Sequence, residues 1–496
     1  MSTVFTLSIL FTLCTVFPVF PVFPLPRCYN FPMNKKILLP LALVFVFVFS
    51  VFMGRAARPE ALTRQHDPVI LTGDQLSDLL GTATGEIFVY AFTSGTPAQI
   101  PYQIDEQNVN GMFVPNGDGL LGNTEELVFM AADAGDYEAD PLLSTPGGDI
   151  YPAFVVTLTD PLSSEQAWAY IYKSPDLTQT FTDDYVSYDA GNDRITSPGL
   201  YSEGFNAVNT FRDYVALGGG PDIVDRDKLR LDGYLISPAF PFNLTEDDIT
   251  KDAVHAIDGP VRVTRVTTST VTIGGVDMTD DGATFFYQSL ITQAASFSTP
   301  LPPIFITYWR ITLDWNAAAS GMTYYDSNNS AGVTIDGIMD AVDIDPVAEW
   351  QEVSGVNGTV ITALDVPDTL SGASTYYKDD STVDPDDTGD QMSYGDAGFQ
   401  VDVPPGGQVY DLLVHTYFLG GIQPNVGAEY FGYYLNPLDV QVAPFGLPTP
   451  TPTPSPTETE TPTPTLTPTP TLTPTITPIP PVVVPPIYLP LVIRGE

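Results

Sequence analysis

The feature that most constrains this chain is a nearly continuous Thr-Pro repeat from residue 447 to residue 481. Proline fixes its own φ angle and has no backbone N–H, so the repeat cannot form a helix or the interior of a sheet. We expect an extended polyproline II spacer, which at ~3.1 Å per residue reaches roughly 100 Å. A spacer of this kind predicts a folded head that is held at a distance from whatever the C-terminal segment is attached to.

An export signal is predicted at residues 33–56. Lys35 and Lys36 precede an apolar run over residues 37–53, and Gly54-Arg55-Ala56 offers a small-residue cleavage step. This order is typical of a secretory signal peptide, which predicts a secreted or cell-surface protein. The alternative is an uncleaved membrane anchor, because the run is near the shortest length that spans a bilayer. Residues 1–32 fit neither role, and we interpret them as a mis-assigned start before Met33.

Cysteine content and charge exclude several classes of function. Cys14 and Cys28 both precede Met33, so the mature chain is predicted to lack cysteine, and with it disulfides, thiol catalysis and zinc–thiolate sites. The formal net charge is −42. Such a surface repels nucleic acid and anionic membrane, leaving the signal segment, if uncleaved, as the membrane contact. The acidity suits either solubility outside the cell or carboxylates that gather around Ca²⁺.

The head, residues 57–446, is predicted to be all-β. It is rich in Tyr, Thr, Val, Phe, Gly and Asp, which favours strands joined by turns. We expect a large antiparallel β-sandwich, either one large sandwich or two smaller ones with a division near residues 180–200, followed by the polyproline stalk. A short helix is predicted after Thr72, with Gly81 as its end.

The strand at residues 307–315 shows the clearest alternation. One face carries Trp309, Ile311, Leu313 and Trp315, whereas the opposite face carries Tyr308, Arg310, Thr312 and Asp314. This period of two predicts an antiparallel strand with one buried face and one solvated face.

The first candidate metal site is the segment 114–125. Asn116, Asp118, Gly119 and Glu125 occupy the third, fifth, sixth and twelfth positions of a calcium-loop pattern. The first position is Val114, which has no side-chain ligand, so an EF-hand is disfavoured. A looser calcium site that includes Asp105 remains as one interpretation, and a plain Asn-Gly/Asp-Gly hairpin turn is the other.

The second candidate metal site is the acidic stretch 379–396. Asp384, Asp386 and Asp390 are its proposed calcium ligands, because carboxylates at this density repel one another unless solvent or a cation separates them. The alternative is a solvated loop.

Other residues give weaker signals. His66 is expected in an exposed stretch, His255 lies near two arginines in sequence, and His415 shares a strand face with Asp411 and Tyr417, a set that could do acid–base work on a sugar. Aromatic pairs could stack on sugar rings, although core packing is the commoner role. These pairs are Tyr324-Tyr325, Tyr376-Tyr377 and the run 430–434.

The C-terminal segment 482–496 contains Tyr488-Leu489-Pro490-Leu491. Together with the Thr-Pro tract it resembles the tails of uncharacterised secreted β-sandwich proteins of Chloroflexota-type bacteria. The resemblance implies a surface location and a docking or sorting role for the tail; a small strand that packs on the head is the alternative. Residues 98–131 are similar to the opening of such proteins, and to the first module of some exo-acting polysaccharide lyases. No site residue is transferred by either similarity.

These observations favour a secreted, stalk-displayed β-sandwich that binds extracellular glycan or another cell-envelope component, with Ca²⁺ as its expected cofactor. We favour a non-enzymatic role because the chain lacks the common catalytic motifs. The alternatives are a carbohydrate-active enzyme, either a polysaccharide lyase or a glycoside hydrolase, and a structural protein of the cell envelope.

Overall fold

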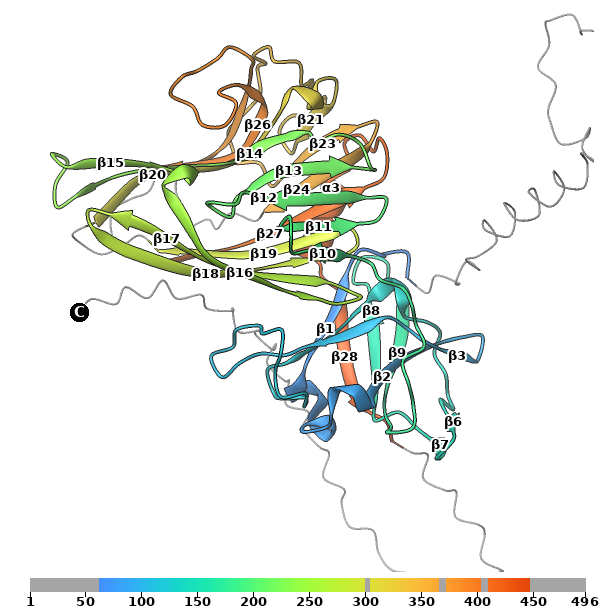
Figure 1. The fold of residues 1–496 in the computed structure, drawn as a ribbon. Coiled ribbons are helices and arrows are strands. Elements are labelled where there is room, and N and C mark those ends of the chain that lie inside the picture. The colour runs from blue at the N-terminus through green and yellow to red at the C-terminus, as the bar shows by residue number, and fades with distance from the viewer. Residues whose placement is uncertain (1–61, 299–303, 365–371, 403–408, 447–496) are drawn as a thin grey trace, which may run out of the picture. The chain divides into compact units, whose positions relative to one another are not determined.

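The computed structural model describes residues 62–298, 304–364, 372–402 and 409–446. The predicted start, signal segment, linker and tail (1–32, 33–56, 447–481 and 482–496) lie outside the described residues. None of the described helices is long and apolar enough to cross a membrane. The prediction of an all-β head built from antiparallel sheets is confirmed, since the named strands pair in antiparallel ladders (Figure 1).

The first part of the head is a small sandwich of two sheets around one core. One sheet has the strand order β1-β5-β4 and the other β28-β8-β9-β2-β3. The strands are β1 (Pro68–Thr72), β2 (Ile87–Thr93), β3 (Thr96–Gln99), β4 (Tyr102–Asp105), β5 (Glu126–Met130), β8 (Phe154–Thr159), β9 (Gln166–Lys173) and β28 (Asp439–Pro444). Alternate residues such as Val69, Leu127, Val89, Val156 and Ile171 are fully buried between the sheets. A separate hairpin consists of β6 (Leu143–Thr145) and β7 (Gly148–Ile150).

The helical turn predicted after Thr72 is present, but as a kinked 3-10 helix, η1 (Gly73–Leu79). The Thr72 backbone N–H donates to Gln75 Oε1 at 2.9 Å, which helps to fix the start of the turn. Leu76 and Leu79 are buried in the core, and Gly81 follows with a φ of 73°. Further short 3-10 turns are η2 (Thr84–Glu86), η3 (Ala131–Asp133), η4 (Glu246–Asp248) and η5 (Ala317–Ala319).

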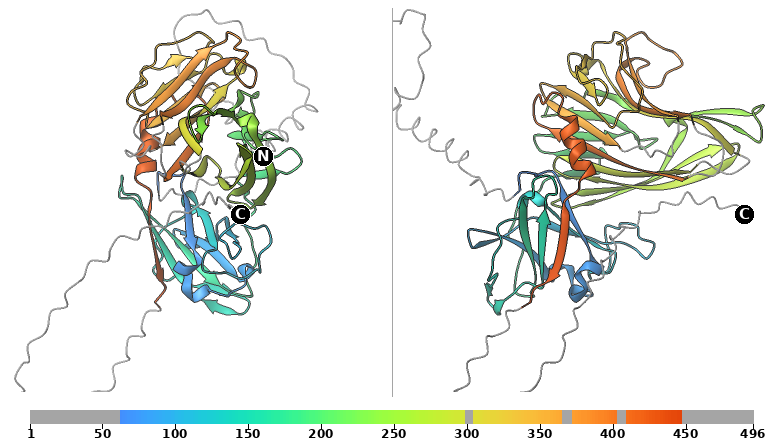
Figure 2. Two further views of the ribbon diagram at one scale, coloured as in Figure 1. Left: turned by 90° about the vertical axis from the view of Figure 1, so that its left-hand side faces the viewer. Right: turned by 180° about the vertical axis from the view of Figure 1, so that it is seen from behind.

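The second part of the head is a larger sandwich, whose two main sheets face each other in Figures 1 and 2. The nine-stranded sheet has the order β16-β17-β18-β19-β27-β24-β23-β21-β22, and the five-stranded sheet β15-β14-β20-β26-β25. A four-stranded sheet, β10-β11-β12-β13, accompanies them. The apolar core between the main sheets forms two clusters, one around Phe286, Trp315 and Phe418 and the other around Phe399 and Leu412.

The strands of the nine-stranded sheet are β16 (Ile249–Asp258), β17 (Val263–Ile273), β18 (Val276–Phe286), β19 (Leu290–Ser298), β21 (Thr323–Asp326), β22 (Val333–Thr334), β23 (Trp350–Gly355), β24 (Gly358–Leu364) and β27 (Val409–Leu419). Those of the five-stranded sheet are β14 (Val224–Leu235), β15 (Pro241–Thr245), β20 (Ile304–Trp315), β25 (Ala373–Asp380) and β26 (Ser393–Asp402). Those of the four-stranded sheet are β10 (Ser187–Asp189), β11 (Arg194–Ser197), β12 (Tyr201–Phe205) and β13 (Arg212–Leu217).

The α-helix α3 (Gly427–Leu435) packs on β24 and β23 of the nine-stranded sheet (Figure 2). The buried carboxylate of Glu352 accepts the N–H groups of residues 425–427 at 2.7–2.9 Å, so a distant strand stabilises the helix N-terminus. Gly427 is required there, because a Cβ atom would lie 2.0 Å from the Trp350 ring.

The prediction that one face of residues 307–315 is solvated is wrong for part of that face. Thr312 and Asp314 on that face of β20 are 3% and 0% exposed. The acidic loop that precedes β26 is fastened to this face, because Asp387 on the loop pairs with Lys228 and Arg230 on β14. Part of this polar face therefore belongs to a buried ionic layer, whereas the alternating sequence pattern alone predicted contact with water.

Candidate functional site

A cleft of about 470 Å³ lies inside the second sandwich, between the nine-stranded and five-stranded sheets. Its lining includes residues from β12 and β13 as well as from both main sheets. Cavities of a few hundred Å³ with mixed polar and apolar walls are typical of small-ligand sites in proteins.

One wall of the cleft is a row of polar side chains, here termed the polar belt. It consists of Arg265, Thr284, Gln293, Thr416, Thr362 and Gln351. In the strand register Arg265 lies opposite Thr284, and Thr284 lies opposite Gln293. Thr362 in turn lies opposite both Thr416 and Gln351. The belt therefore crosses the inner face of the nine-stranded sheet from β17 to β23.

The belt stands between apolar positions of the same strands. On β27, Thr416 is flanked on its own face by Phe418 and Val414, which belong to the two core clusters. Gln293 is exposed even though it lies on an inward-facing position of β19. Packing alone gives no reason for amides and hydroxyls here, since apolar side chains would fill a sandwich core.

The opposite wall of the cleft is apolar. Ile311 and Leu313 on β20 and Ala397 and Phe399 on β26 line it. Gln351 connects the walls, because its Nε2 donates to the carbonyl of Gly398 at 2.9 Å. The cleft thus presents hydrogen-bonding groups on one side and a hydrocarbon surface on the other.

Charged groups at one end of the cleft neutralise each other. Arg212 donates to Glu203 Oε1 at 2.8 Å and to Asp227 Oδ1 at 3.0 Å. Burial raises the pKa of Glu203 from its ordinary value, while the guanidinium of Arg212 opposes that shift. Burial opposes the charge of Arg212, but Asp227 and Glu203 outweigh it and raise the pKa of Arg212.

Arg265 of the polar belt is also paired. It donates from Nε and Nη2 to the carboxylate of Asp193 at 2.9 and 2.8 Å, and its guanidinium carbon lies 3.8 Å from the centre of the Phe205 ring. Burial opposes ionisation of Asp193, but Arg265 overcomes this and lowers its pKa. Each guanidinium of the cleft therefore has a carboxylate partner, so the cleft offers polar contacts without a strong net field.

The segment 114–125 brings two of its predicted ligands together. The carboxylates of Asp118 and Glu125 lie with that of Glu106 in a group in which one oxygen from each residue is within 4.8 Å of the other two. Burial raises the pKa of Glu125, and the charges of Glu106 and Asp118 raise it further. The hydrogen bond from the Gly122 N–H opposes this shift. Asn116 is exposed and is not part of this carboxylate group. Three carboxylate oxygens at this spacing fit the donor chemistry of Ca²⁺.

Glu106 was missed from the sequence, where Asp105 was named instead. Strand alternation explains the difference, because Asp105 ends β4 pointing into the molecule, where Arg262 Nε donates to its Oδ2 at 2.7 Å. Glu106 follows the strand and accepts the backbone N–H of Gly119 at 3.1 Å, which directs it toward the 114–125 turn. The sequence feature that could have identified Glu106 is its position directly after the end of β4.

The three predicted ligands of the second acidic stretch do not form a comparable group within the described residues. Asp384 and Asp386 are joined only through turn contacts, since the Asp386 N–H donates to Asp384 Oδ1 at 3.1 Å. The backbone N–H of Asp390 donates to Asp225 Oδ1 at 3.1 Å. The stretch serves to fasten the loop to β14, a role that its charge pattern alone did not reveal.

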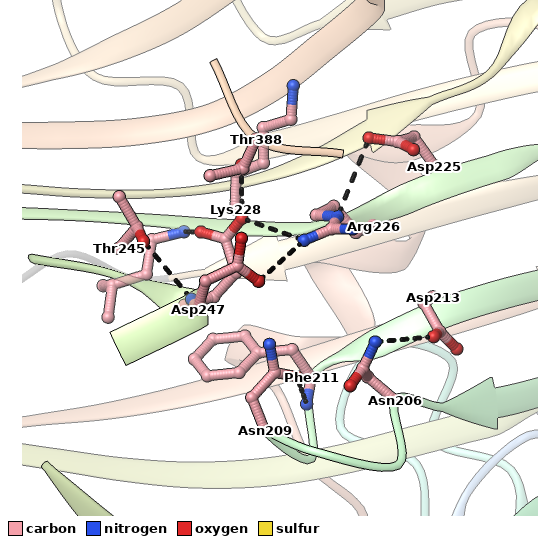
Figure 3. A network of polar contacts seen from close by, with 12 residues as sticks. Asn206, Asn209, Phe211, Asp213, Asp225, Arg226, Lys228, Thr245, Asp247 and Thr388 are labelled. Atoms are coloured by element: carbon pink, nitrogen blue, oxygen red, sulfur yellow. Dashed lines mark hydrogen bonds and ion pairs between the residues drawn. The ribbon is translucent and has the colours of Figure 1, made fainter. Parts of the chain in front are cut away.

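Figure 3 shows from close by the polar contacts around Arg226 and Thr388, where the acidic loop meets β14 and η4. Arg226 lies between Asp225 and Asp247, with its Nη1 3.0 Å from Asp247 Oδ1. Thr388 of the acidic loop donates to the fully buried carboxylate of Glu246, which also accepts from Arg230 at 2.8 Å. These contacts neutralise the charges around η4 and β14, and calcium binding by Asp384, Asp386 and Asp390 stays a prediction.

The histidines lie away from the cleft lining. His66 was expected to be exposed, and this expectation is wrong. Its Nδ1 lies 2.7 Å from Ser289 Oγ and its Nε2 lies 3.1 Å from the hydroxyl of Tyr430. Burial lowers the pKa of His66. His415 contacts the hydroxyl of Tyr417 at 3.3 Å, and burial lowers its pKa to about 4. His255 lies 3.0 Å from the carbonyl of Phe113.

The aromatic pairs are mostly internal. Tyr324 is fully buried, and its ring packs on that of Tyr377 at 4.4 Å between centroids. Tyr430 is 8% exposed on α3. The expectation of core packing for these aromatics therefore describes them better than sugar stacking does.

No protein-family model and no curated protein matches the chain. Two solved structures superimpose on part of it. An α-mannosidase from Enterococcus faecalis V583 does so with a TM-score of 0.41 and 9% identity, over 77% of this chain and 45% of the mannosidase chain. A protein of glycosyl hydrolase family 38 from Enterococcus faecalis gives a TM-score of 0.41 and 9% identity, over 78% and 46%. This chain spans less than half the length of either protein, and a likeness at this level carries no argument about activity.

Proposed function

We propose that this protein binds extracellular glycan, and that it holds a neutral oligosaccharide in the cleft between the two main sheets. The observation that supports this most is the polar belt on the inner face of the nine-stranded sheet, opposite the apolar wall of β20 and β26. Residue types that a sandwich core does not need are gathered there along one wall of the cleft.

The chemistry of a sugar ring suits these two walls. Its hydroxyls both donate and accept hydrogen bonds, as do the amides of Gln293 and Gln351 and the hydroxyls of Thr284 and Thr416. Its C–H faces pack on hydrocarbon, which Ile311 and its apolar neighbours supply. An uncharged ligand is favoured because Arg212 and Arg265 already have carboxylate partners.

Surface display completes the proposal. The predicted signal segment, the Thr-Pro tract and the resemblance of the tail support a head that is exported and held on a stalk. A glycan of the surroundings or of the cell envelope is then the partner that the cleft meets.

The test is isothermal titration calorimetry of the mature protein with a panel of neutral and acidic oligosaccharides. We expect a neutral member to bind, and Gln293→Ala to weaken binding about tenfold, because one amide hydrogen-bonding group contributes about 1.4 kcal/mol. Thr292→Ala is the matched control, since the neighbouring side chain on β19 points to the other face of the sheet. Equal affinity of both variants would place the glycan elsewhere, and binding of acidic members alone would contradict a neutral ligand.

A second candidate function, glycan cleavage, is favoured by one residue. Glu203 lines the cleft, and burial raises its pKa even though Arg212 donates to it; a carboxyl with a raised pKa suits a general acid once that ion pair is released. Reducing-end or double-bond assays on the bound oligosaccharide separate the two functions. Product that disappears in Glu203→Gln supports an enzyme, and intact oligosaccharide supports a binding protein.

A further inference from the structure

Three buried ionisable side chains meet on the outer face of the five-stranded sheet, away from the cleft. Lys228 on β14 and Asp314 on β20 are 0% exposed, and Asp396 on β26 is 1% exposed. The register places Lys228 opposite Thr312, two residues from Asp314, and Leu313 opposite Ala397. Residues two apart on a strand share a face, so neighbouring strands aim these three side chains at one point.

The contact between Lys228 and Asp314 is short, and both side chains are fully buried. Lys228 Nζ lies 2.5 Å from Asp314 Oδ2, whereas N–H···O bonds between charged groups are about 2.7–2.9 Å long. The ammonium nitrogen and the carboxyl oxygen are therefore in direct contact inside the protein. The other oxygen, Oδ1, accepts the N–H of Tyr394 at 3.1 Å, which fixes the carboxyl group in place.

We propose that Lys228 and Asp314 condense to form an intramolecular isopeptide bond, and that Asp396 relays the protons of this reaction. The product is an amide between Nζ of Lys228 and Cγ of Asp314 that joins β14 to β20. The proposed bond lies outside the glycan site, and its test does not depend on whether the protein binds glycan.

The reaction balances without a co-reactant. Asp396 as a carboxylate takes one proton from the Lys228 ammonium, and the neutral amine attacks Cγ of the protonated Asp314 carboxyl. The N–Cγ bond forms, the Cγ–OH bond breaks, and the hydroxyl leaves as water with a second nitrogen proton. The third proton stays on the amide nitrogen, and Asp396 ends the reaction protonated, so the net charge is unchanged.

The surroundings support the required protonation states. Burial, and then the neighbouring Asp396, raise the pKa of Asp314 well above its usual range, which keeps its carboxyl neutral. Burial opposes the charge of Lys228, which favours the neutral amine once Asp314 is protonated. As carboxylates, Asp314 and Asp396 raise the pKa of Lys228, so its proton must pass to Asp396 for the reaction to begin. Burial also raises the pKa of Asp396, and its Oδ1 lacks a hydrogen-bond partner among the described residues.

The close approach of the two groups and the exclusion of water from the site also favour the reaction. Holding an amine against a carboxyl makes the reaction effectively unimolecular, a gain worth several powers of ten in rate. The lysine is further held by Asp387 Oδ2 at 2.9 Å and by the carbonyl of Met392 at 3.3 Å, both from the acidic loop and the residues that follow it. That loop covers the site, and excluding water opposes hydrolysis of the new amide.

The test is mass spectrometry of the purified full-length protein, whose N-terminus is first established by peptide sequencing. We expect an intact mass below that of the sequence by one water molecule. Proteolytic mapping is then expected to yield one branched peptide that contains both Lys228 and Asp314. A mass equal to that of the sequence, or a water loss that maps to another site, would overturn the proposal and leave an ion pair.

Two variants identify the roles. Asp314→Ala removes the acceptor, and Asp396→Asn keeps the size of the side chain but cannot take the proton, so both are expected to retain the full sequence mass. Asp386→Asn, on the exposed loop, is the matched control and is expected to lose water as the wild type does. A branched peptide that persists in Asp396→Asn would refute the relay role, and its assignment to Lys228 and Asp387 would refute the choice of acceptor.

Discussion

Arg262 is fully buried, yet each part of its guanidinium meets an acceptor. Its Nε donates to Asp105 at 2.7 Å, and its Nη2 donates to Glu126 at 2.6 Å. Its Nη1 donates to the hydroxyl of Tyr287 at 3.2 Å. The arginine, which directly precedes β17, is thereby tied to β4 and β5, which joins the larger sandwich to the smaller one.

Replacing this arginine should be costly. Arg262→Met removes the cation and leaves two carboxylates buried without their counter-charge, for which we expect a loss of about 3–5 kcal/mol in unfolding free energy. Urea unfolding followed by fluorescence measures it. Arg194→Met is the control, since Arg194 stacks on Tyr214 at 3.6 Å in a less buried place. Equal losses in both variants would show that the buried ion pairs have no special weight.

Asp225 predicts a pH dependence with a definite sign. Burial, and then the neighbouring Asp390, raise its pKa to about 6. A carboxyl whose pKa is higher in the folded state binds a proton more tightly there, so its contribution to stability falls as the pH rises from about 4 to about 6.

Asp225→Asn removes that ionisation and still offers an oxygen to the Asp390 N–H. We expect the variant to melt at a higher temperature than the wild type at pH 7, with the difference shrinking toward pH 4. Differential scanning calorimetry across this range is the measurement. A difference that grows as the pH falls would contradict the assignment.

At the scale of single elements, strands were predictable and their surroundings were not. The predicted strand at residues 307–315 lies within β20, because β-branched and aromatic residues that alternate with polar ones carry local information. The burial of Asp314 depends on a loop far away in the sequence, so alternation alone could not reveal it.

The helix α3 was missed for a related reason. Its sequence begins with Gly427, contains Gly432 and has several aromatic residues, so its helix propensity is weak. Its N-terminus is stabilised by Glu352 of β23, a contact between residues distant in the sequence. The polar belt was missed likewise, since a glutamine such as Gln293 looks the same in sequence whether its strand face is solvated or lines a cleft.

Calcium binding by the 114–125 loop stays a prediction. Glu125 is buried beside Glu106 and Asp118, and a cation would relieve the repulsion among them. We expect Ca²⁺ to raise the melting temperature of the mature protein, and Glu125→Gln to remove most of that rise. Asp384→Asn on the acidic loop serves as the control and should leave it unchanged. The same rise in wild type and Glu125→Gln would rule out this loop as the site.

At the scale of the whole molecule, the two sandwiches differ in their interiors. The small one is closed by an apolar core, whereas the larger one keeps a cleft with the polar belt on one wall. The ionic layer on the outer face of the five-stranded sheet supports the wall opposite the belt, since β14, β20 and β26 contribute to both. The larger sandwich thus keeps a cleft between its sheets, which the proposed glycan binding requires.

The most direct measurement of the central claim is a crystal structure of the mature protein with the tightest-binding oligosaccharide of the panel. We expect sugar density between the two main sheets, with hydroxyls in hydrogen-bond contact with Gln293 and its neighbours in the polar belt and a ring face against Ile311. An empty cleft with the sugar bound on another surface would contradict the account.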